Sequence, residues 1–183
     1  MPVTESIHEL VRRSVAERQP IDDAERFGVE RFLLEFDRLA DPFDQRLDRV
    51  HVTGSAIVVG PRGVVLLRHK RLGMWLQPGG HIDPGETPWG AARRETLEET
   101  GLEASFAHVD ASGVPHLLHV DVHAGGRGHT HLDLRYQLDG GSTDPSPADG
   151  ESPDVAWFGW PAAIERAGDE RLVALLRSLA TRF

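Results

Sequence analysis

Apolar residues in the first 48 positions recur at helical spacing and predict two amphipathic helices. The first helix is predicted to begin at Ser6, which has capping-box spacing to Glu9. The second is predicted to open at Pro20 and to end before Pro42. Its apolar stripe comprises Ile21, Ala24, Phe32, Leu33, Phe36 and Leu39. Because both helices have an apolar face to bury, we expect residues 1–48 to be a helical extension that packs on the main domain or on a second copy of the chain. A dedicated recognition element is the alternative.

From His51 onward the pattern alternates with the period of β-strands. The predicted strands lie at residues 53–59, 64–67, 114–123, 129–138 and 155–160. Between the second and third strands, Thr87 can cap a helix that Gly101 ends. One or two helices are predicted to close the chain over residues 162–183. The mixture predicts an α/β domain over residues 49–183, with a C-terminal helix and no second domain.

Composition narrows the classes of protein that fit this pattern. The 183 residues carry 20 basic and 29 acidic side chains, a net charge of −9, which disfavours nucleic acid or an anionic membrane as the main partner. The N-terminus lacks the apolar run of a signal peptide, and no stretch approaches the roughly 20 apolar residues of a membrane span. The absence of cysteine excludes disulfides and thiolate metal sites. We therefore expect a cytoplasmic protein.

Three carboxylates on the predicted helix before Gly101 stand where a purely structural helix would not place them. Glu95, Glu98 and Glu99 have i, i+3 and i+4 spacing and share one face of the last turns. Like charges at this spacing cost roughly 0.2–0.5 kcal/mol per pair, and the helix dipole adds about 0.3–1 kcal/mol per charge. A bound divalent cation reverses the sign of these terms, and hard oxygen ligands suit Mg²⁺ or Mn²⁺. A solvated acidic face, partly neutralised by Arg93 and Arg94, is the alternative.

The surrounding stretch resembles the Nudix box, G-x5-E-x7-R-E-U-x-E-E-x-G-U, where U is apolar. Its positions are filled by Gly80, Glu86, Arg94, Glu95, Thr96, Glu98, Glu99, Gly101 and Leu102. Thr96 is the one departure, because it occupies an apolar position. The resemblance covers residues 80–102 closely and residues 51–160 loosely. It implies a Nudix-type α/β/α sandwich with a mixed sheet, to which the N-terminal helices are added.

The resemblance also implies a function and its residues. The implied reaction is metal-dependent hydrolysis of a diphosphate linkage in a nucleoside diphosphate joined to another moiety, by attack of water on phosphorus. Glu98, Glu95 and Arg94 are assigned to the catalytic machinery, where Arg94 and Glu86 brace the helix and loop. Glu95, Glu98 and Glu99, together with the Gly79 carbonyl, are assigned to Mg²⁺ or Mn²⁺. Some members use a further acid from a later loop; here the candidates are Asp149, Glu151 and Asp154, and Glu151 is preferred.

Other residues are candidates for binding the substrate. These are Arg68 and Lys70, in a basic run ahead of the box, and His131, Asp133 and Arg135, in a predicted hairpin. Folding the hairpin about Gly126 predicts the pairs His119–Asp133, Asp121–His131 and His123–His129. The polar face of the hairpin is then a water-facing surface, a wall of the substrate cleft, or a zinc site built from His123, His129 and His131.

The sequence therefore favours a Nudix pyrophosphohydrolase acting on a small nucleoside diphosphate derivative, with a homodimer as a candidate assembly. Two alternatives belong to other classes. A ligand-sensing regulatory protein of the same fold usually loses box carboxylates, which are intact here. An isopentenyl diphosphate isomerase relies on a catalytic cysteine, which this chain lacks.

Overall fold

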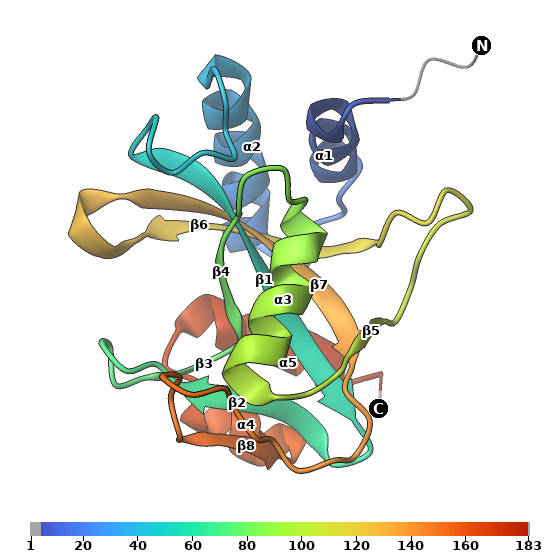
Figure 1. The fold of residues 1–183 in the computed structure, drawn as a ribbon. Helices are drawn as coiled ribbons and strands as arrows, with labels where there is room; N and C mark the ends of the chain where they lie inside the picture. The colour runs from blue at the N-terminus through green and yellow to red at the C-terminus, as the bar shows by residue number, and fades with distance from the viewer. Residues whose placement is uncertain (1–4, 183) are drawn as a thin grey trace.

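A mixed β-sheet runs through the centre of the structure, a computed structural model that describes residues 5–182 (Figure 1). Its strands are β1 (Val50–Gly60), β2 (Gly63–Arg68), β3 (Trp75–Leu76), β4 (Gly79–His81), β5 (Ser105–Phe106), β6 (Leu117–Ala124), β7 (Thr130–Asp139) and β8 (Val155–Phe158). The long strands β1 and β7 pair in parallel, whereas the other pairs are antiparallel. β1 also pairs with β2 and β4, so it anchors both halves of the sheet.

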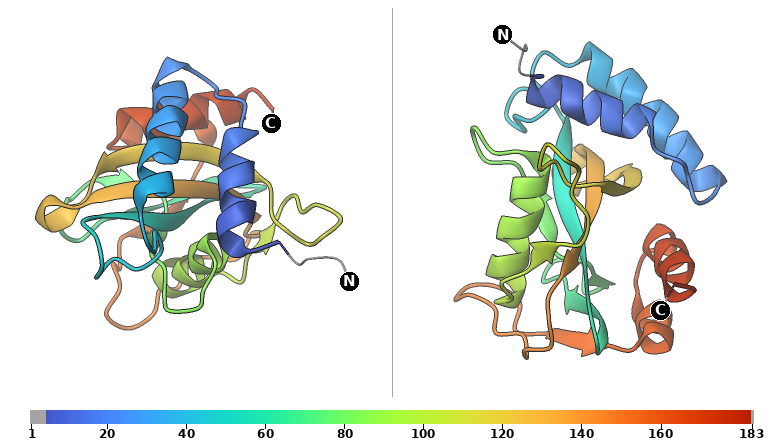
Figure 2. Two further views of the ribbon diagram at one scale, coloured as in Figure 1. Left: turned by 90° about the horizontal axis from the view of Figure 1, so that it is seen from above. Right: turned by 90° about the vertical axis from the view of Figure 1, so that its right-hand side faces the viewer.

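Helices cover both faces of this sheet. α3 (Pro88–Thr100) lies on one face, and α4 (Trp160–Arg166) and α5 (Glu170–Ala180) lie on the other (Figure 2, right). α1 (Ile7–Ala16) and α2 (Asp23–Arg38) cross one end of the sheet. The predicted α/β/α sandwich with a mixed sheet and an N-terminal helical extension is confirmed. No helix within residues 5–182 combines the length and the apolar character needed to cross a bilayer.

The alternation along β1 divides the core into two parts. Val52, Ala56 and Val58 join a cluster that includes Ala91 and Ala92 of α3. Ile57 and Val59 point the other way and pack with α5, including Leu172, Leu175, Leu176 and Leu179. The period-two pattern of the strand thus produces two buried layers.

The ends of α3 are those that the sequence predicts. Thr87 caps the helix by accepting a hydrogen bond from Gly90 N at 2.9 Å, and Pro88 occupies its first turn. Gly101 ends it in the left-handed region, with φ of 70°, which favours glycine. The three glutamates therefore do lie in the last turns of the helix.

The N-terminal helices pack on the domain, as one of the two predictions has it. The Ser6–Glu9 capping box of α1 is present, and Val11 and Val15 enter the main core with Phe32 and Phe36 of α2. The predicted start of α2 at Pro20 is wrong. The helix begins at Asp23, because the Asp22 carboxylate caps it by accepting from the backbone N–H of residue 25.

Glu25 is a buried carboxylate that joins the N-terminal helices to the sheet. It is 2% exposed, although Ala24 beside it was the predicted member of the apolar stripe and is exposed. Its carboxylate accepts from Arg18 Nε at 2.7 Å, from Ile21 N at 2.7 Å and from Val120 N at 3.1 Å. Val120 lies on β6, which in the described part of the chain pairs with β7 alone. Glu25 therefore satisfies a backbone donor on the outer edge of the sheet.

The hairpin of β6 and β7 has a different register from the predicted one. The observed pairs are His119–Arg135, Asp121–Asp133 and His123–His131. The turn is centred one residue later than expected, on a 3-10 turn at Gly126–Gly128 in which Arg127 has φ of 59°. Because this changes each pairing by two residues, the polar and apolar faces keep their predicted composition.

His119 lies deep on the polar face of this hairpin. It is 2% exposed, and its Nδ1 lies 3.5 Å from Arg135 Nη1. Burial, together with the charge of Arg135, lowers the pKa of His119 to about 2. The folded protein therefore keeps this imidazole neutral.

We expect Glu25→Ala to lower the free energy of unfolding by about 2–4 kcal/mol, because it leaves Arg18 and two backbone N–H groups without their acceptor. Denaturant unfolding measures this loss. Glu30→Ala is the matched control, since Glu30 is an exposed residue of the same helix that pairs with Arg26. Its effect is expected to stay within about 0.5 kcal/mol. Equal losses in both variants would contradict the assigned role of Glu25.

We expect His119→Gln to reduce the acid sensitivity of the fold. The unfolded chain takes up a proton on His119 below a pKa of about 6.5, whereas the folded chain does not until far lower pH. Stability is therefore lost as pH falls below about 6.5, by up to about 1.4 kcal/mol per pH unit from this group. Unfolding free energies between pH 7 and pH 5 measure the slope. His116→Gln, at an exposed histidine, is expected to keep the wild-type slope; an unchanged slope in His119→Gln would refute the prediction.

Candidate active site

The backbone of the short strand β4 contacts three charged side chains of α3. Three consecutive residues of the strand each meet a different side chain of the helix. The contacts are Gly79 N donating to Glu99 Oε2 (2.9 Å), Gly80 lying against the Glu95 carboxylate, and His81 O accepting from Arg94 Nη2 (2.8 Å). A Cβ at Gly80 would overlap the Glu95 carboxylate, so a larger residue there would force this side chain to move. The predicted box residues are therefore held by backbone groups of the strand that precedes the helix.

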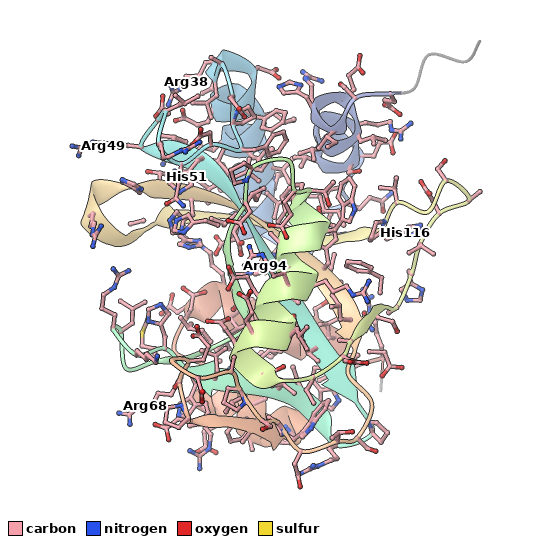
Figure 3. The ribbon with its side chains drawn as sticks, viewed as in Figure 1. Arg38, Arg49, His51, Arg68, Arg94 and His116 are labelled. Atoms are coloured by element: carbon pink, nitrogen blue, oxygen red, sulfur yellow. The ribbon has the colours of Figure 1, made fainter. Side chains whose placement is uncertain are left out.

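Arg94 is the central cation of this cluster (Figure 3). Its guanidinium lies 3.0 Å from Glu86, 2.9 Å from Glu95 and 3.1 Å from Glu98. Burial opposes the charge on Arg94, but hydrogen bonds and ion pairs with Glu86 and Glu95 raise its pKa. The Glu86–Arg94 contact joins the loop to the helix, which is the bracing arrangement that the resemblance implied.

Two of the glutamates are held in surroundings that disfavour their charge. Burial raises the pKa of Glu99 to about 8, although the Gly79 N–H opposes the shift. Burial also raises the pKa of Glu95, against the effect of Arg94. Glu98 is more open, with 47% of its side chain exposed. A bound cation would favour the charged form of these clustered carboxylates.

The three carboxylates do not converge on one point. Among residues 5–182, their oxygens are not gathered within 4.8 Å of one another. Arg94 binds Glu95 and Glu98, whereas Gly79 N binds Glu99. A divalent ion still fits this donor set, because Mg²⁺ is usually held by one or two carboxylates together with water and substrate phosphates.

The loop between β7 and β8 brings a fourth acid to the cluster. Ser146 N donates to Thr100 O at 2.8 Å and Ala148 N donates to Glu98 O at 2.9 Å, which satisfies carbonyls that the helix end leaves free. The negative charge of Glu151 contributes to the raised pKa values of Glu95 and Glu99. Of the other two candidates, Asp154 lies 3.8 Å from Arg68 and Asp149 is exposed. Glu151 is thus the candidate acid that acts electrostatically on the site.

Thr96, the departure from the box pattern, is accommodated within the helix. Its side chain is fully buried, and its Oγ1 donates to Ala92 O at 2.7 Å. Because the hydroxyl is satisfied locally, the buried position tolerates threonine.

A second polar network lies on the sheet, on the face that carries the polar residues of the hairpin. Asp133 accepts from Thr53 Oγ1 at 2.8 Å, from Ser55 Oγ at 2.7 Å and from Arg135 Nε at 3.2 Å. Arg135 Nη2 donates to Asp121 at 2.9 Å. All five side chains belong to residues that are at most 4% exposed. Thr53 and Ser55 were not predicted as site residues. Two polar residues at alternate positions of an otherwise apolar strand could have indicated a buried polar partner on that face.

Asp121 is held as an anion in this network. Burial alone would raise its pKa, but His123, Arg135 and Arg171 together lower it. His123 Nδ1 lies 3.2 Å from Asp121, an ion-pair contact without good hydrogen-bond geometry. Arg171, at the start of α5, lies 3.3 Å away and is 42% exposed. The interpretation of the polar hairpin face as a water-facing surface is wrong, because partners from β1 and α5 enclose it.

The remaining predicted residues occupy different places. Arg68 is 54% exposed and points outward, away from Arg94 (Figure 3), and Lys70 is exposed in the loop after β2. His131 lies against His51 and His81, with ring centroids 5.1 and 5.3 Å away. The alternative of a zinc site within the hairpin is corrected, because the histidines that come together in residues 5–182 are drawn from three strands rather than from one turn.

Known proteins are similar to this chain in sequence and in fold. A NUDIX domain matches residues 49–177. An RNA pyrophosphohydrolase of Brucella abortus is 30% identical over 125 residues, which are 58% of this chain and 70% of that protein. A putative 8-oxo-dGTP diphosphatase of Bacillus subtilis is 46% identical over 60 residues, which are 32% of this chain and 40% of that protein. The chain spans less than half the length of several curated relatives that it matches.

The structural comparison agrees with the sequence comparison. A NUDIX-family hydrolase from Clostridium perfringens superposes with a TM-score of 0.59 at 27% identity, over 73% of this chain and 99% of that one. The matched region contains the helix, the glutamates and Arg94 described above. The chain therefore belongs to the NUDIX family.

Proposed function

We propose that this protein hydrolyses a diphosphate linkage in a nucleoside diphosphate derivative, with Mg²⁺ or Mn²⁺ bound at the end of α3. The observation that supports this most strongly is the cluster of partly buried carboxylates in the last turns of α3, beside Arg94. Burial raises the pKa values of two of its acids, which a structural helix would gain nothing from. A bound cation would compensate the negative charge of this cluster and could in turn bind an anionic substrate.

Glu95, Glu98 and Glu99 would hold the ion, directly or through bound water because their oxygens do not converge on one point, and the Gly79 carbonyl would join them. The metal, when bound, neutralises charge on the phosphate oxygens and acidifies the attacking water. The chain itself supplies the frame: Arg94 fixes Glu95 and Glu98 relative to the Glu86 loop, and β4 fixes Glu99.

We assign the acceptance of the proton to a carboxylate at the open side of the cluster. As water attacks phosphorus, a new P–O bond forms, the bond to the bridging oxygen breaks, and one proton passes from water to the base. Glu98 is suited to this task, because it is the carboxylate of α3 with 47% of its side chain exposed. Glu151 is the second candidate, from the loop tied to the same helix end.

The names of two relatives support the class of substrate that we propose. The Brucella protein is named an RNA pyrophosphohydrolase and the Bacillus protein a putative 8-oxo-dGTP diphosphatase. For this chain we propose a small nucleoside diphosphate derivative, and the exposed side chains of Arg68 and Lys70 would have to turn toward the carboxylates to contact its phosphates. The Asp133–Arg135 network is buried, so its role would be to hold the sheet rigid rather than to contact the substrate. A regulatory protein with a silent box is less well supported, since every box carboxylate is present.

Glu98→Gln is expected to lower kcat by about 100- to 10,000-fold, because it removes a general base and a metal ligand. Release of phosphate or nucleotide is measured with Mg²⁺ over nucleoside triphosphates, nucleotide sugars, ADP-ribose and non-nucleotide diphosphates. Glu103→Gln is the control, since Glu103 is exposed and lies beyond the helix. Wild-type turnover in Glu98→Gln would exclude Glu98 from the chemistry, and no turnover of any compound by the wild type would contradict the proposed function.

Removal of divalent metal with EDTA is expected to abolish turnover. Addition of Mg²⁺ or Mn²⁺ in excess over the chelator should restore it, because oxygen ligands prefer these ions. Steady-state rates before and after the addition measure the effect. Turnover that continues in EDTA would refute the metal-dependent mechanism.

A further inference from the structure

Three histidines outside the carboxylate cluster meet at one end of the sheet. His51, His81 and His131 each offer a ring nitrogen, and these atoms all lie within 4.8 Å of one another. The ring centroids form a nearly equilateral triangle with sides of 5.1, 5.1 and 5.3 Å. We call these residues the histidine triad.

The triad is built from adjacent strands. In the sheet, β1 lies between β4 and β7, and His51 of β1 is directly paired with His131 of β7. His81 of β4 is paired with Thr53, two positions along β1. Each imidazole therefore comes from a different strand, and their meeting depends on backbone pairing rather than on a flexible loop.

The triad leaves buried nitrogen atoms without partners. His51 is fully buried, and its Nδ1 lies 3.3 Å from Asp48 O. Since a carbonyl can only accept, Nδ1 carries the hydrogen, and a neutral ring then has its lone pair on Nε2. Within residues 5–182, that Nε2 is buried and finds no hydrogen-bond partner, and the same is true of His81 Nε2. An imidazole whose second nitrogen donates to a carbonyl is the usual arrangement of a metal-binding histidine.

The electrostatic surroundings of the triad are mixed. Burial lowers the pKa of His51, and burial with neighbouring histidines lowers that of His131 to about 3, so both rings are neutral and can donate lone pairs. His129 packs edge-on against His51. The ring centroids of His123 and His131 are 5.4 Å apart. Arg71 is the opposing charge, because it acts on His81. Its side chain belongs to an exposed residue and reaches the hairpin near Gly126.

We propose that the histidine triad binds one zinc ion, which links β1, β4 and β7. Imidazole favours Zn²⁺ over Mg²⁺, and three histidines leave a fourth position for water or a neighbouring histidine. Tetrahedral Zn–N bonds of about 2.0–2.1 Å place the nitrogens about 3.3 Å apart. The nitrogens lie within 4.8 Å of one another, so the rings would close in by up to about 1.5 Å when the ion binds. This site is separate from the carboxylate cluster and does not rest on the proposed function.

The test uses the full chain, stripped of metal and then titrated with Zn²⁺ in the presence of excess Mg²⁺ to occupy the carboxylates. Calorimetry is expected to show one saturable equivalent, and Zn²⁺ should raise Tm. His131→Gln is expected to weaken this binding by about 100-fold or more. His116→Gln is the matched control, because His116 is exposed on the opposite side of the molecule from His51 (Figure 3). It should bind Zn²⁺ as the wild type does.

Co²⁺ supplies an independent measurement that needs no variant. Tetrahedral Co²⁺ with nitrogen ligands absorbs visible light much more strongly than octahedral Co²⁺ with oxygen ligands, so the wild type should develop the strong spectrum. If His131→Gln does not fold, this spectrum decides the question. No saturable Zn²⁺ binding beside Mg²⁺, a weak octahedral spectrum, equal binding by folded His131→Gln, or a Zn²⁺-soaked crystal with water between the three imidazoles would each overturn the proposal.

Discussion

The ion pairs of Arg94 are the interaction on which the site depends. Glu86, Glu95 and Glu98 all lie within 3.1 Å of one guanidinium, and a backbone carbonyl of β4 completes its surroundings. Without this cation, several carboxylates would face one another in a partly buried place, where their repulsion is poorly screened. Arginine suits the position because its planar group binds several acceptors at fixed angles and stays charged. The loop, the helix and the strand are thereby held in one arrangement.

Strand β4 connects this cluster to the rest of the sheet. It is only three residues long, yet its backbone contacts Glu99, Glu95 and Arg94, and its last side chain belongs to the histidine triad. Because β4 pairs with β1, displacing the acids relative to the sheet has to break either their contacts with β4 or the pairing of β4 with β1. The chemistry proposed for α3 is thus supported by the central strand of the domain rather than by the helix alone.

Local signals in the sequence predict local structure well. The cap at Thr87, the stop at Gly101 and the box glutamates were all placed correctly, because each depends on neighbours within a few residues. Contacts between distant segments were beyond the same reasoning. In the sequence Glu25 resembles an ordinary exposed acid of a helix, and only the fold brings Val120 N to it. In the same way, strand pairing brings His51 and His81 to His131. The predicted hairpin register differs from the observed one by two residues. The turn places Arg127 in the left-handed region, and an arginine gives no sequence signal for that conformation.

The Glu25–Val120 contact also bears on how copies of this chain could associate. An unpaired strand edge invites a second chain to continue the sheet by backbone hydrogen bonding. Along β6 that route is obstructed by α2, which takes up the free amide of Val120 and lies so close that a side chain at Gly28 would press on Val120 O. Sheet continuation at this edge is therefore blocked at Val120, whereas the outer side of α2, where Phe27 and Leu34 are exposed, is open to a second copy.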